Sequence, residues 1–404
     1  MPAALAVTGG GIVTAAGRGL DAAWEALRAG RSFLAPDDEL AGFSSIETAR
    51  CAPPGPEMLG ADRRAARLMG RHTHMLLAAV SDALAEAGGN AAGLAGEEMA
   101  FFAGMDSVDP GEADFVSAVQ ASRVEGGGVD LGRFFNEGMT QIPPLWPLGM
   151  LNSTAFCQVA IQFGLRGENG LFSPGAEAAA QAVIEAAESL REGKARAALA
   201  AGVSPTVSVR SVARYRKRGL LKPDAAPDGG PALGEGAASL LLEPEGVAGG
   251  KPRLGYIRGW GRATAGYEPG DLAGAVRDSA AAALQRAEIG PGRVGLVVVH
   301  GGGSVEEGEA EAEGIAAVLG GHRPLALATK GAFGHLLGGG PAVDLLIALR
   351  AMAEGAVPPS PGAGNSGGDV LEFPDRPKAA RLEAGLVLVQ GFDGACAAFA
   401  VGPA

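Results

Sequence analysis

Residues Phe172 to Val183 read FSPGAEAAAQAV. The Pro-Gly pair after an apolar run predicts the end of a strand, and the alanines that follow predict a helix. Many enzymes mount a nucleophilic side chain at such a strand-to-helix turn. Here the turn carries Ala176 and no cysteine, and the nearest hydroxyl, that of Ser173, precedes the turn. The sequence therefore predicts an elbow at residues 170–180 without a nucleophile.

Strands and helices alternate on both sides of this elbow. A helix (AAAQAVIEAAESLREG) and a strand (ARAALAAGVS) follow it, and a later series contains GLVVVHGGG, PLALATKGAFGH, PAVDLLIALRAMAEG and AGLVLVQGFDGACAAFAV. The segment EPEGVAGGKPRLG interrupts the pattern between residues 243 and 255. We therefore expect two α/β halves, residues 1–245 and 246–404, which share one interface.

Two further segments carry structural expectations. Gly9 to Gly11 close the first apolar run and are expected to form a plain strand-to-helix turn, because the GxGxxG spacing of a dinucleotide site is missing. Residues 106–150 contain DPGEAD, EGGG and IPPLWPLG and are expected to be irregular. Long irregular stretches in compact enzymes often border a pocket or an interface.

Composition excludes several classes of function. The 404 residues are 47% hydrophobic and include 66 glycines, which suits a large, tightly packed α/β core. A formal net charge of −12 argues against nucleic acid or an anionic membrane as partner. With no leader-like N-terminus and no apolar run of about 18 residues, we expect a cytoplasmic protein. The three cysteines have unrelated spacings, so neither a disulfide framework nor a metal site is expected.

Two histidines and a lysine follow strand ends in the second half. His300 ends the run LVVVH before a glycine turn, His335 lies between GAF and LLGGG, and Lys330 precedes it. One such histidine alone would more often be structural, but the three together indicate a functional site. Neutral imidazoles on rigid turns can donate hydrogen bonds to a developing oxyanion or enolate. The sequence thus predicts an oxyanion-stabilising site in the second half.

The chain resembles the β-ketoacyl-acyl-carrier-protein synthases, the condensing enzymes of fatty acid and polyketide synthesis. The resemblance runs nearly end to end and rests on VTGGGIVTAAGRGLDAAWEALRAGRS, IQFGLRGEN, KPDAAPDGGPALGEGAASLLLE, ATKGAFGHLLGGG and GFDGACAAF. It implies an α/β thiolase fold with five layers, α/β/α/β/α, built from two similar halves with mixed sheets. It also implies a dimer and an acyl carrier protein as partner.

The same resemblance assigns roles to individual residues. His300 and His335 resemble the pair that binds the thioester carbonyl and assists malonyl decarboxylation, and Lys330 with Glu311 resembles the supporting ion pair. Phe392, beside Gly391, resembles the gate of the acyl pocket, and Ser304 resembles a hydroxyl that grips the substrate arm. That arm is the 4′-phosphopantetheine of the carrier protein, and no bound cofactor is implied.

The sequence departs from the family at the positions that matter for transfer. Ala176 falls where the family has its nucleophilic cysteine, and an alanine cannot carry an acyl chain. The family's His-Gly-Thr-Gly-Thr reads HGGGS from His300 to Ser304, so one of two hydroxyls is missing. The second glycine of the terminal Gly-Phe-Gly-Gly motif is Asp393.

Three functions remain open from the sequence. The chain is a chain-length-factor-like subunit that pairs with a cysteine-bearing ketosynthase, or a malonyl-carrier-protein decarboxylase that makes an acetyl primer with His300 and His335. The third reading is a cysteine-to-alanine variant of an active synthase, although Ser173 to Gly175 also differ from the family's usual Thr-Ala. The partner is then a ketosynthase in a heterodimer or a second copy in a homodimer.

One basic segment stands out from the acidic chain. The run VRSVARYRKRGLLK is expected to be either a solvated face or a docking surface for an acidic carrier protein. Its candidate docking residues are Arg210, Arg214, Arg216, Lys217 and Arg218.

Overall fold

The structure is a computed structural model that describes residues 4–52, 69–88, 94–108, 113–173, 175–204, 207–217, 221, 232–268, 270–362 and 370–404. Over these residues the strands form one large sheet with the order β14-β13-β17-β18-β12-β1-β11-β9-β5-β8. The two edge strands of this sheet, β14 and β8, belong to different halves of the chain. Within this sheet, a short antiparallel pairing between β1 and β12, from Leu5 with Ile257 to Val7 with Gly255, joins the halves.

The two halves repeat one topology. If the five strands of each half are numbered in sequence order, their order across the sheet is 3-2-4-5-1 in both halves, starting from the edge. The same neighbours are parallel and the same neighbours antiparallel in the two halves. The first half contains β1 (Leu5–Thr14), β5 (Met99–Met105), β8 (Asn169–Phe172), β9 (Ala197–Val203) and β11 (Ala237–Pro244). The second contains β12 (Gly255–Thr264), β13 (Val294–Val298), β14 (Leu325–Leu327), β17 (Ala384–Gln390) and β18 (Ala395–Gly402).

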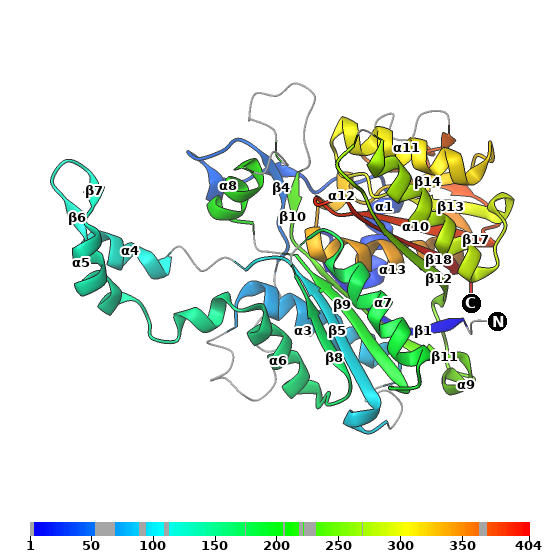
Figure 1. The fold of residues 1–404 in the computed structure, drawn as a ribbon, viewed down its shortest axis with the longest axis horizontal. Coiled ribbons are helices and arrows are strands. Elements are labelled where there is room, and N and C mark those ends of the chain that lie inside the picture. The colour runs from blue at the N-terminus through cyan, green and yellow to red at the C-terminus, as the bar shows by residue number, and fades with distance from the viewer. Residues whose placement is uncertain are drawn as a thin grey trace.

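Helices complete the expected five layers (Figure 1). One outer layer packs on the first half and the other on the second, while two helices lie between the half-sheets. The first outer layer holds α3 (Arg71–Glu86) and α6 (Asn152–Phe163), the centre holds α7 (Ala178–Arg191) and α13 (Gly340–Glu354), and the second outer layer holds α10 (Asp271–Ala287) and α11 (Val305–Leu319). The predicted α/β/α/β/α architecture with mixed sheets is confirmed.

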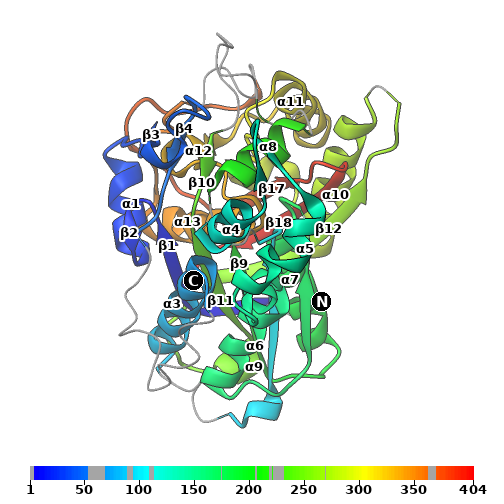
Figure 2. The same ribbon diagram turned by 90° about the vertical axis from the view of Figure 1, so that its left-hand side faces the viewer.

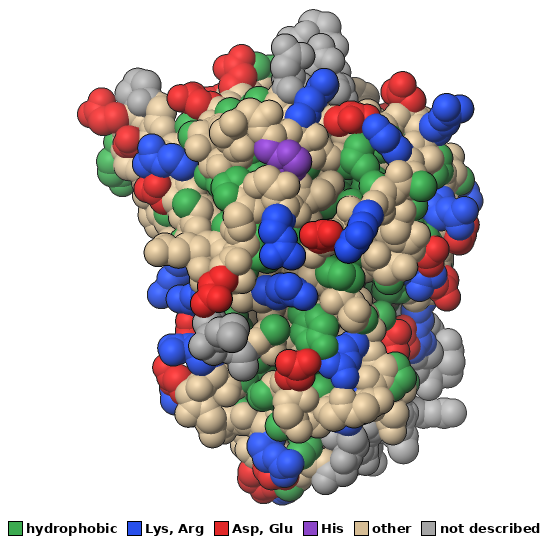
Figure 3. All heavy atoms as spheres, turned by 90° about the vertical axis from the view of Figure 1, so that its right-hand side faces the viewer, with side chains coloured by type: hydrophobic (Ala, Val, Ile, Leu, Met, Phe, Trp, Pro, Cys, Tyr) green, Lys and Arg blue, Asp and Glu red, His purple; other side chains and the backbone are tan. Residues whose placement is uncertain are grey.

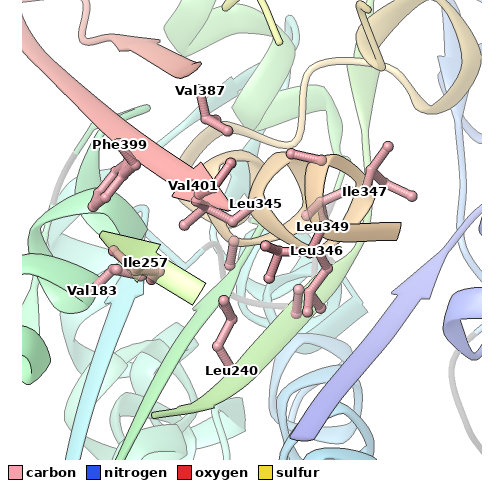
Figure 4. Close-up of a cluster of buried hydrophobic side chains, with 14 of the residues drawn as sticks. Val183, Leu240, Ile257, Leu345, Leu346, Ile347, Leu349, Val387, Phe399 and Val401 are labelled. Atoms are coloured by element: carbon pink, nitrogen blue, oxygen red, sulfur yellow. The ribbon is translucent and has the colours of Figure 1, made fainter. Parts of the chain in front are cut away.

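The central helix α13 is apolar on almost every side, which predicts burial rather than an amphipathic surface position. All residues from Gly340 to Leu349 are buried. Figure 4 shows its leucines and Ile347 among side chains from both halves, with Leu240 and Ile257 on one side and Val387 and Phe399 on another. Since each fully buried side chain of this size stabilises a fold by roughly 1.5–3 kcal/mol, this layer contributes strongly to holding the halves together.

The triple glycine does not form a turn. Gly9 to Gly11 lie inside β1, which continues to Thr14. A Cβ at Gly11 would collide with the Ala79 carbonyl oxygen of α3, and one at Gly261 of β12 would collide with the Ser279 carbonyl oxygen of α10. Both halves therefore use glycine in the first strand to bring the outer helix close to the sheet.

Residues 113–150 form an arm that extends from the body in Figure 1 and faces the viewer in Figure 2. The expectation of irregular structure is partly wrong, because short elements follow one another: α4 (Ala113–Ala121), β6 (Arg123–Val124), β7 (Gly128–Val129), α5 (Leu131–Asn136), η5 (Gly138–Gln141) and η6 (Trp146–Met150). The arm exposes large apolar side chains, among them Leu131 at 69% and Phe135 at 66%. Such a surface is rare on a monomer.

Smaller elements complete the chain. A three-stranded sheet is formed by β3 (Ala35–Pro36), β4 (Glu47–Ala49) and β10 (Leu233–Gly234). The others are α1 (Leu20–Arg28), β2 (Gly17–Arg18), η1 (Asp38–Leu40), η4 (Gly96–Glu98), α8 (Val209–Lys217), α9 (Glu245–Ala248), η7 (Pro291–Arg293), α12 (Lys330–Phe333), η8 (Leu337–Gly339), β15 (Ala356–Val357) and β16 (Lys378–Ala379).

Two surface properties bear on the excluded functions. Across the face shown in Figure 3, basic and acidic side chains are interspersed rather than gathered by sign. Among the described helices, none combines the length and the apolar character needed to cross a membrane.

Candidate active site

The elbow lies between β8 and α7. The strand ends at Phe172, and the helix begins at Ala178 with Glu177 as its N-cap residue. Gly175 has φ of 138°, a conformation that side chains other than glycine rarely adopt. Ala176 directly follows and is fully buried. The elbow thus presents a methyl group at the start of the central helix.

His300 and His335 come together as the sequence predicts. Their ring centroids are 5.2 Å apart with the planes at 70°. His300 follows β13 after one residue, and His335 lies between α12 and η8, so both occupy turns at the ends of buried elements. The side chains are 3% and 2% exposed. The glycine-rich turns therefore hold two imidazoles against each other inside the protein.

The protonation of the pair follows from its surroundings. Burial, and then the charge of Lys330, lowers the pKa of both imidazoles well below the usual value. Each ring is therefore neutral near pH 7. Nδ1 of His335 accepts a hydrogen bond from the Leu337 backbone N–H at 3.0 Å, which leaves the proton on Nε2. The Nε2 atoms of both rings are buried and have no hydrogen-bond partner among the described residues.

Lys330 and Glu311 support the turn at His300, but they do not form the direct ion pair that the resemblance implies. Lys330 Nζ donates to the His300 carbonyl oxygen and lies 3.6 Å from Asp344 Oδ2. Glu311 instead accepts the backbone N–H groups of His300 at 2.5 Å and Gly301 at 3.1 Å. The lysine pairs with Asp344 because α13 brings that carboxylate to it, whereas α11 places Glu311 against the backbone.

The charged groups of this support are all deeply buried. Burial raises the pKa of Glu311 to about 7, although the two backbone N–H groups and Lys330 oppose that rise. Burial also raises the pKa of Asp344, against the charge of Lys330 and a 2.5 Å hydrogen bond from the Thr329 hydroxyl. Asp344 was not anticipated from the sequence. The signal was present, because a single aspartate in the apolar run PAVDLLIAL requires a buried partner.

Phe392, the residue that the resemblance assigns to the gate, lies beside His335. Its ring centroid is 5.5 Å from that of His335 and 6.1 Å from that of Tyr215. A cavity of about 260 Å³ adjoins the site and is lined by Lys330, His335 and Gly301 to Gly303, among others. The Ser304 hydroxyl accepts the Glu307 backbone N–H at 3.2 Å and caps α11. Its oxygen thus already has a structural role.

Other nucleophilic groups lie away from the histidine pair or are inert. Cys157 is exposed on α6. Ser173 accepts a 3.1 Å hydrogen bond from the Asn152 side chain. Cys396 is buried, and burial together with nearby carboxylates raises the pKa of its thiol to about 12, so the thiol stays protonated at neutral pH.

The basic segment forms helix α8. Arg210 and Lys217 are exposed, whereas Arg214 and Arg216 are half-buried. The Arg210 guanidinium lies 5.1 Å from the Phe115 ring centroid, and Arg216 donates to the Ser44 hydroxyl at 2.8 Å. Arg218, the remaining candidate, lies outside the described residues. Among the described residues of the patch, Arg210 and Lys217 are therefore the most open to a partner.

This fold and this buried histidine pair define a condensing-enzyme scaffold of the thiolase type, and the comparisons agree. Residues 3–248 match the β-ketoacyl synthase N-terminal domain, and residues 254–363 match the β-ketoacyl synthase C-terminal domain. The chain belongs to the β-ketoacyl synthase family.

Two curated relatives illustrate the range of similarity. The tetracenomycin polyketide synthase ketoacyl synthase beta subunit of Streptomyces glaucescens is 27% identical over 97% of this chain and 97% of its own length. A mycocerosic acid synthase-like polyketide synthase of Mycolicibacterium smegmatis is 29% identical over 75% of this chain. This chain spans only 14% of the length of that second relative.

Solved structures share the fold along the whole chain. The ishigamide ketosynthase/chain length factor superimposes with a TM-score of 0.82 at 21% identity and full coverage of both chains. A β-ketoacyl synthase from Burkholderia phymatum STM815 superimposes with a TM-score of 0.80 at 22% identity, covering 99% of each chain. At these identities the likeness establishes the fold.

Proposed function

We propose that this chain is a chain-length-factor-like subunit that pairs with a cysteine-bearing ketosynthase. The observation that carries the proposal is Ala176, which occupies the elbow with a buried methyl group where acyl transfer needs a nucleophile. The end-to-end similarity to a ketoacyl synthase beta subunit supports the same role. In this role the partner performs the transfer, and this chain shapes the space in which the product grows.

The surface supports a partner subunit. Strand β8 is the edge of the sheet and so offers unpaired backbone groups to another chain. The arm exposes Leu131, Phe135 and Met139, the last at 49%. An arm of this kind gains stability when a second subunit covers it. Because Phe135 and Met139 reach outward from the body, they are the side chains we assign to the partner's product channel.

The substrate is carried on the 4′-phosphopantetheine group of an acyl carrier protein. An acidic carrier fits the basic residues of α8, of which Arg210 and Lys217 are exposed. The carrier delivers its thioester to the paired subunits rather than to this chain alone, and no further cofactor is required for that chemistry.

A second function, malonyl-carrier-protein decarboxylation, is favoured by the unpartnered Nε2 atoms of His300 and His335. In that reaction the bond from the α-carbon to the carboxylate breaks and carbon dioxide leaves. The electron pair forms an enolate whose oxygen accepts the imidazole hydrogen bonds, and water then protonates the carbon to give an acetyl thioester. This route needs no thiol.

Copurification with the cognate ketosynthase tests the proposal. We expect a one-to-one heterodimer by mass, and products whose length changes when Phe135→Trp or Met139→Trp enlarges the arm. A matched control is Tyr267→Trp, which alters a fully exposed side chain outside the arm. A synthase that makes the same products without this chain would contradict the proposal. Condensation by Ala176→Cys alone would instead favour a variant of an active synthase.

A further inference from the structure

Glu177, the residue after Ala176, connects the elbow with the turn that carries Phe392. Its carboxyl folds back over the elbow, so that a Cβ added at Gly175 would collide with its Oε2 atom. A Cβ added at Gly391 would collide with the same oxygen. One carboxyl group therefore fills the space over both glycines, between the start of α7 and the end of β17.

Asp393 approaches the same place from the other side. A Cβ at Gly391 would lie 3.0 Å from Asp393 Oδ1. That oxygen also accepts the Ala395 backbone N–H at 3.2 Å, and Gly391 N–H donates to the Ala395 carbonyl at 2.6 Å, so the turn is compact. Two carboxyl groups thus converge on Gly391. If both are ionised on this one glycine, their like charges destabilise each other.

The surroundings offer the pair little compensation. Oε2 of Glu177 is buried and has no hydrogen-bond partner among the described residues. Burial first, and then Asp393 and Asp106, raises the pKa of Glu177 to about 7. Asp106 accepts the Tyr215 hydroxyl. The nearby cation Arg262 lies 3.9 Å from Glu185 and 3.4 Å from the Gln181 side-chain oxygen.

The remaining titratable neighbours lie behind the turn. Cys396 of β18 keeps its proton, because its pKa is raised to about 12, and Glu311 of α11 lies beyond it against the His300 turn. A cavity of about 430 Å³ opens next to Glu177 and is lined by Gln181, Arg262, Ala395 and Cys396, among others. An ionised carboxylate can therefore turn toward water in this cavity.

We propose that Glu177 and Asp393 form a proton-dependent latch that holds the 391–394 turn, and with it Phe392, against the elbow. With a proton on Glu177, only Asp393 carries a charge at the turn, so the two carboxyl groups do not repel and the Phe392 ring stays beside His335. When that proton passes to water, the two carboxylates repel and the turn separates from the elbow. Glu177 is a positioning residue, because it acts on the histidine site through Phe392.

The direction of the pH dependence follows from linkage. The closed turn is the state in which the pKa of Glu177 is raised, so the closed turn binds the proton more tightly than the open one. Closure is favoured at low pH, weakens as pH rises from the ordinary value of 4.5 toward about 7, and changes little above that. Between about pH 5.5 and pH 7.5 the opening equilibrium should rise about tenfold or more.

Amide hydrogen exchange of the turn, read by mass spectrometry on peptides covering residues 391–402, tests the latch in the intact protein. After correction for intrinsic exchange, we expect protection in this peptide to fall about tenfold or more over that pH range. Glu177→Gln keeps the shape without the charge and should remove the pH dependence. The matched control is Glu185→Gln on the same helix, which should keep it.

Two results would overturn the latch: constant protection in the unaltered protein, or the same pH slope in Glu177→Gln. If Glu177→Gln proves unstable, Asp393→Asn removes the other charge and should reduce the pH dependence, although burial of Glu177 keeps part of it. The measurement needs neither substrate nor partner. It therefore succeeds or fails independently of the function proposed above.

Discussion

At the scale of single residues, Ala176 limits the chemistry of the elbow more than any other side chain. A methyl group has no electron pair to attack a thioester, and the buried site gives no access to another nucleophile at that point. The neighbouring hydroxyl and thiol do not serve as the nucleophile in its place. Cys157 lies exposed on α6, and the Ser173 hydroxyl accepts a hydrogen bond from Asn152. Transfer to this chain therefore has no acceptor atom at the elbow.

Incubation with an acyl-carrier-protein thioester should accordingly leave the mass of the chain unchanged. Intact-protein mass spectrometry measures this directly, with an active ketosynthase as the positive control. An acyl adduct that peptide mapping places on Ser173 or Cys157 would contradict the assignment of Ala176 as the nucleophile position.

Loss of the Asp344 carboxylate should cost considerable stability. It is 2% exposed and is the partner of Lys330, whose side chain is itself only 10% exposed. Removal of one member of a buried ion pair typically destabilises a protein by about 3–5 kcal/mol, because the other charge stays buried. Asp344→Asn should therefore lower the free energy of unfolding by about 3 kcal/mol in urea denaturation.

The control for that measurement is Asp278→Asn. Asp278 is paired with Arg277 on the exposed face of α10, so its replacement should leave the midpoint unchanged. Equal midpoints for Asp344→Asn and the unaltered protein would show that the buried charge of Lys330 does not need Asp344 as its partner.

The sequence predicts the histidine pair because each histidine follows an apolar run at a glycine turn, and such runs end at the same side of a sheet. It does not predict which carboxylate meets Lys330. Glu311 and Asp344 are 19 and 14 residues from Lys330, and only the packing of α11 and α13 decides between them. Pairings set by tertiary packing leave no local pattern to read.

At the scale of elements, Gly9 to Gly11 also show that tertiary packing cannot be predicted from a local pattern. Glycine next to an apolar run commonly marks a turn. Here the glycines lie within β1, where they allow α3 to approach the strand closely. Helices and strands with strong periodicity, such as α13 and β17, follow the sequence closely. The arm does not, since its short helices are held by neighbours rather than by their own length.

Helix α8 carries the prediction on carrier-protein binding. Reversal of its exposed charges, in Arg210→Glu with Lys217→Glu, should slow association with an acidic carrier protein about tenfold at low salt, because complementary charge mainly sets the association rate. Stopped-flow or surface plasmon resonance measures the rate, and added salt should shrink the difference. Arg381→Glu, an exposed change outside α8, is the control. Unchanged association at low salt would remove α8 from the docking surface.

At the scale of the whole molecule, the duplicated topology divides the candidate site between the two halves. The elbow belongs to the first half, whereas His300, Lys330 and His335 belong to the second, and the buried layer of α7 and α13 holds both. A fully buried alanine at position 176 is compatible with the packing of that layer. The buried histidine pair lies in the same molecule as an elbow that carries alanine, and this is why two functions fit the same structure.

The isolated chain distinguishes those two functions through malonyl-carrier-protein turnover. If the chain is a partner subunit, acetyl-carrier-protein formation by the chain alone will be negligible, and His300→Ala or His335→Ala will little affect the rate of the paired ketosynthase. If it is a decarboxylase, each substitution removes one hydrogen-bond donor from the enolate oxygen and should slow turnover on the order of a hundredfold or more. Carbon dioxide release and acetyl-carrier-protein mass measure the reaction. The matched control is His322→Ala, which alters a histidine whose Nε2 contacts the Val294 carbonyl oxygen. We expect the result for a partner subunit, because the arm and the β8 edge have no role in a lone decarboxylase. Rapid, histidine-dependent acetyl formation by the isolated chain would instead favour the decarboxylase.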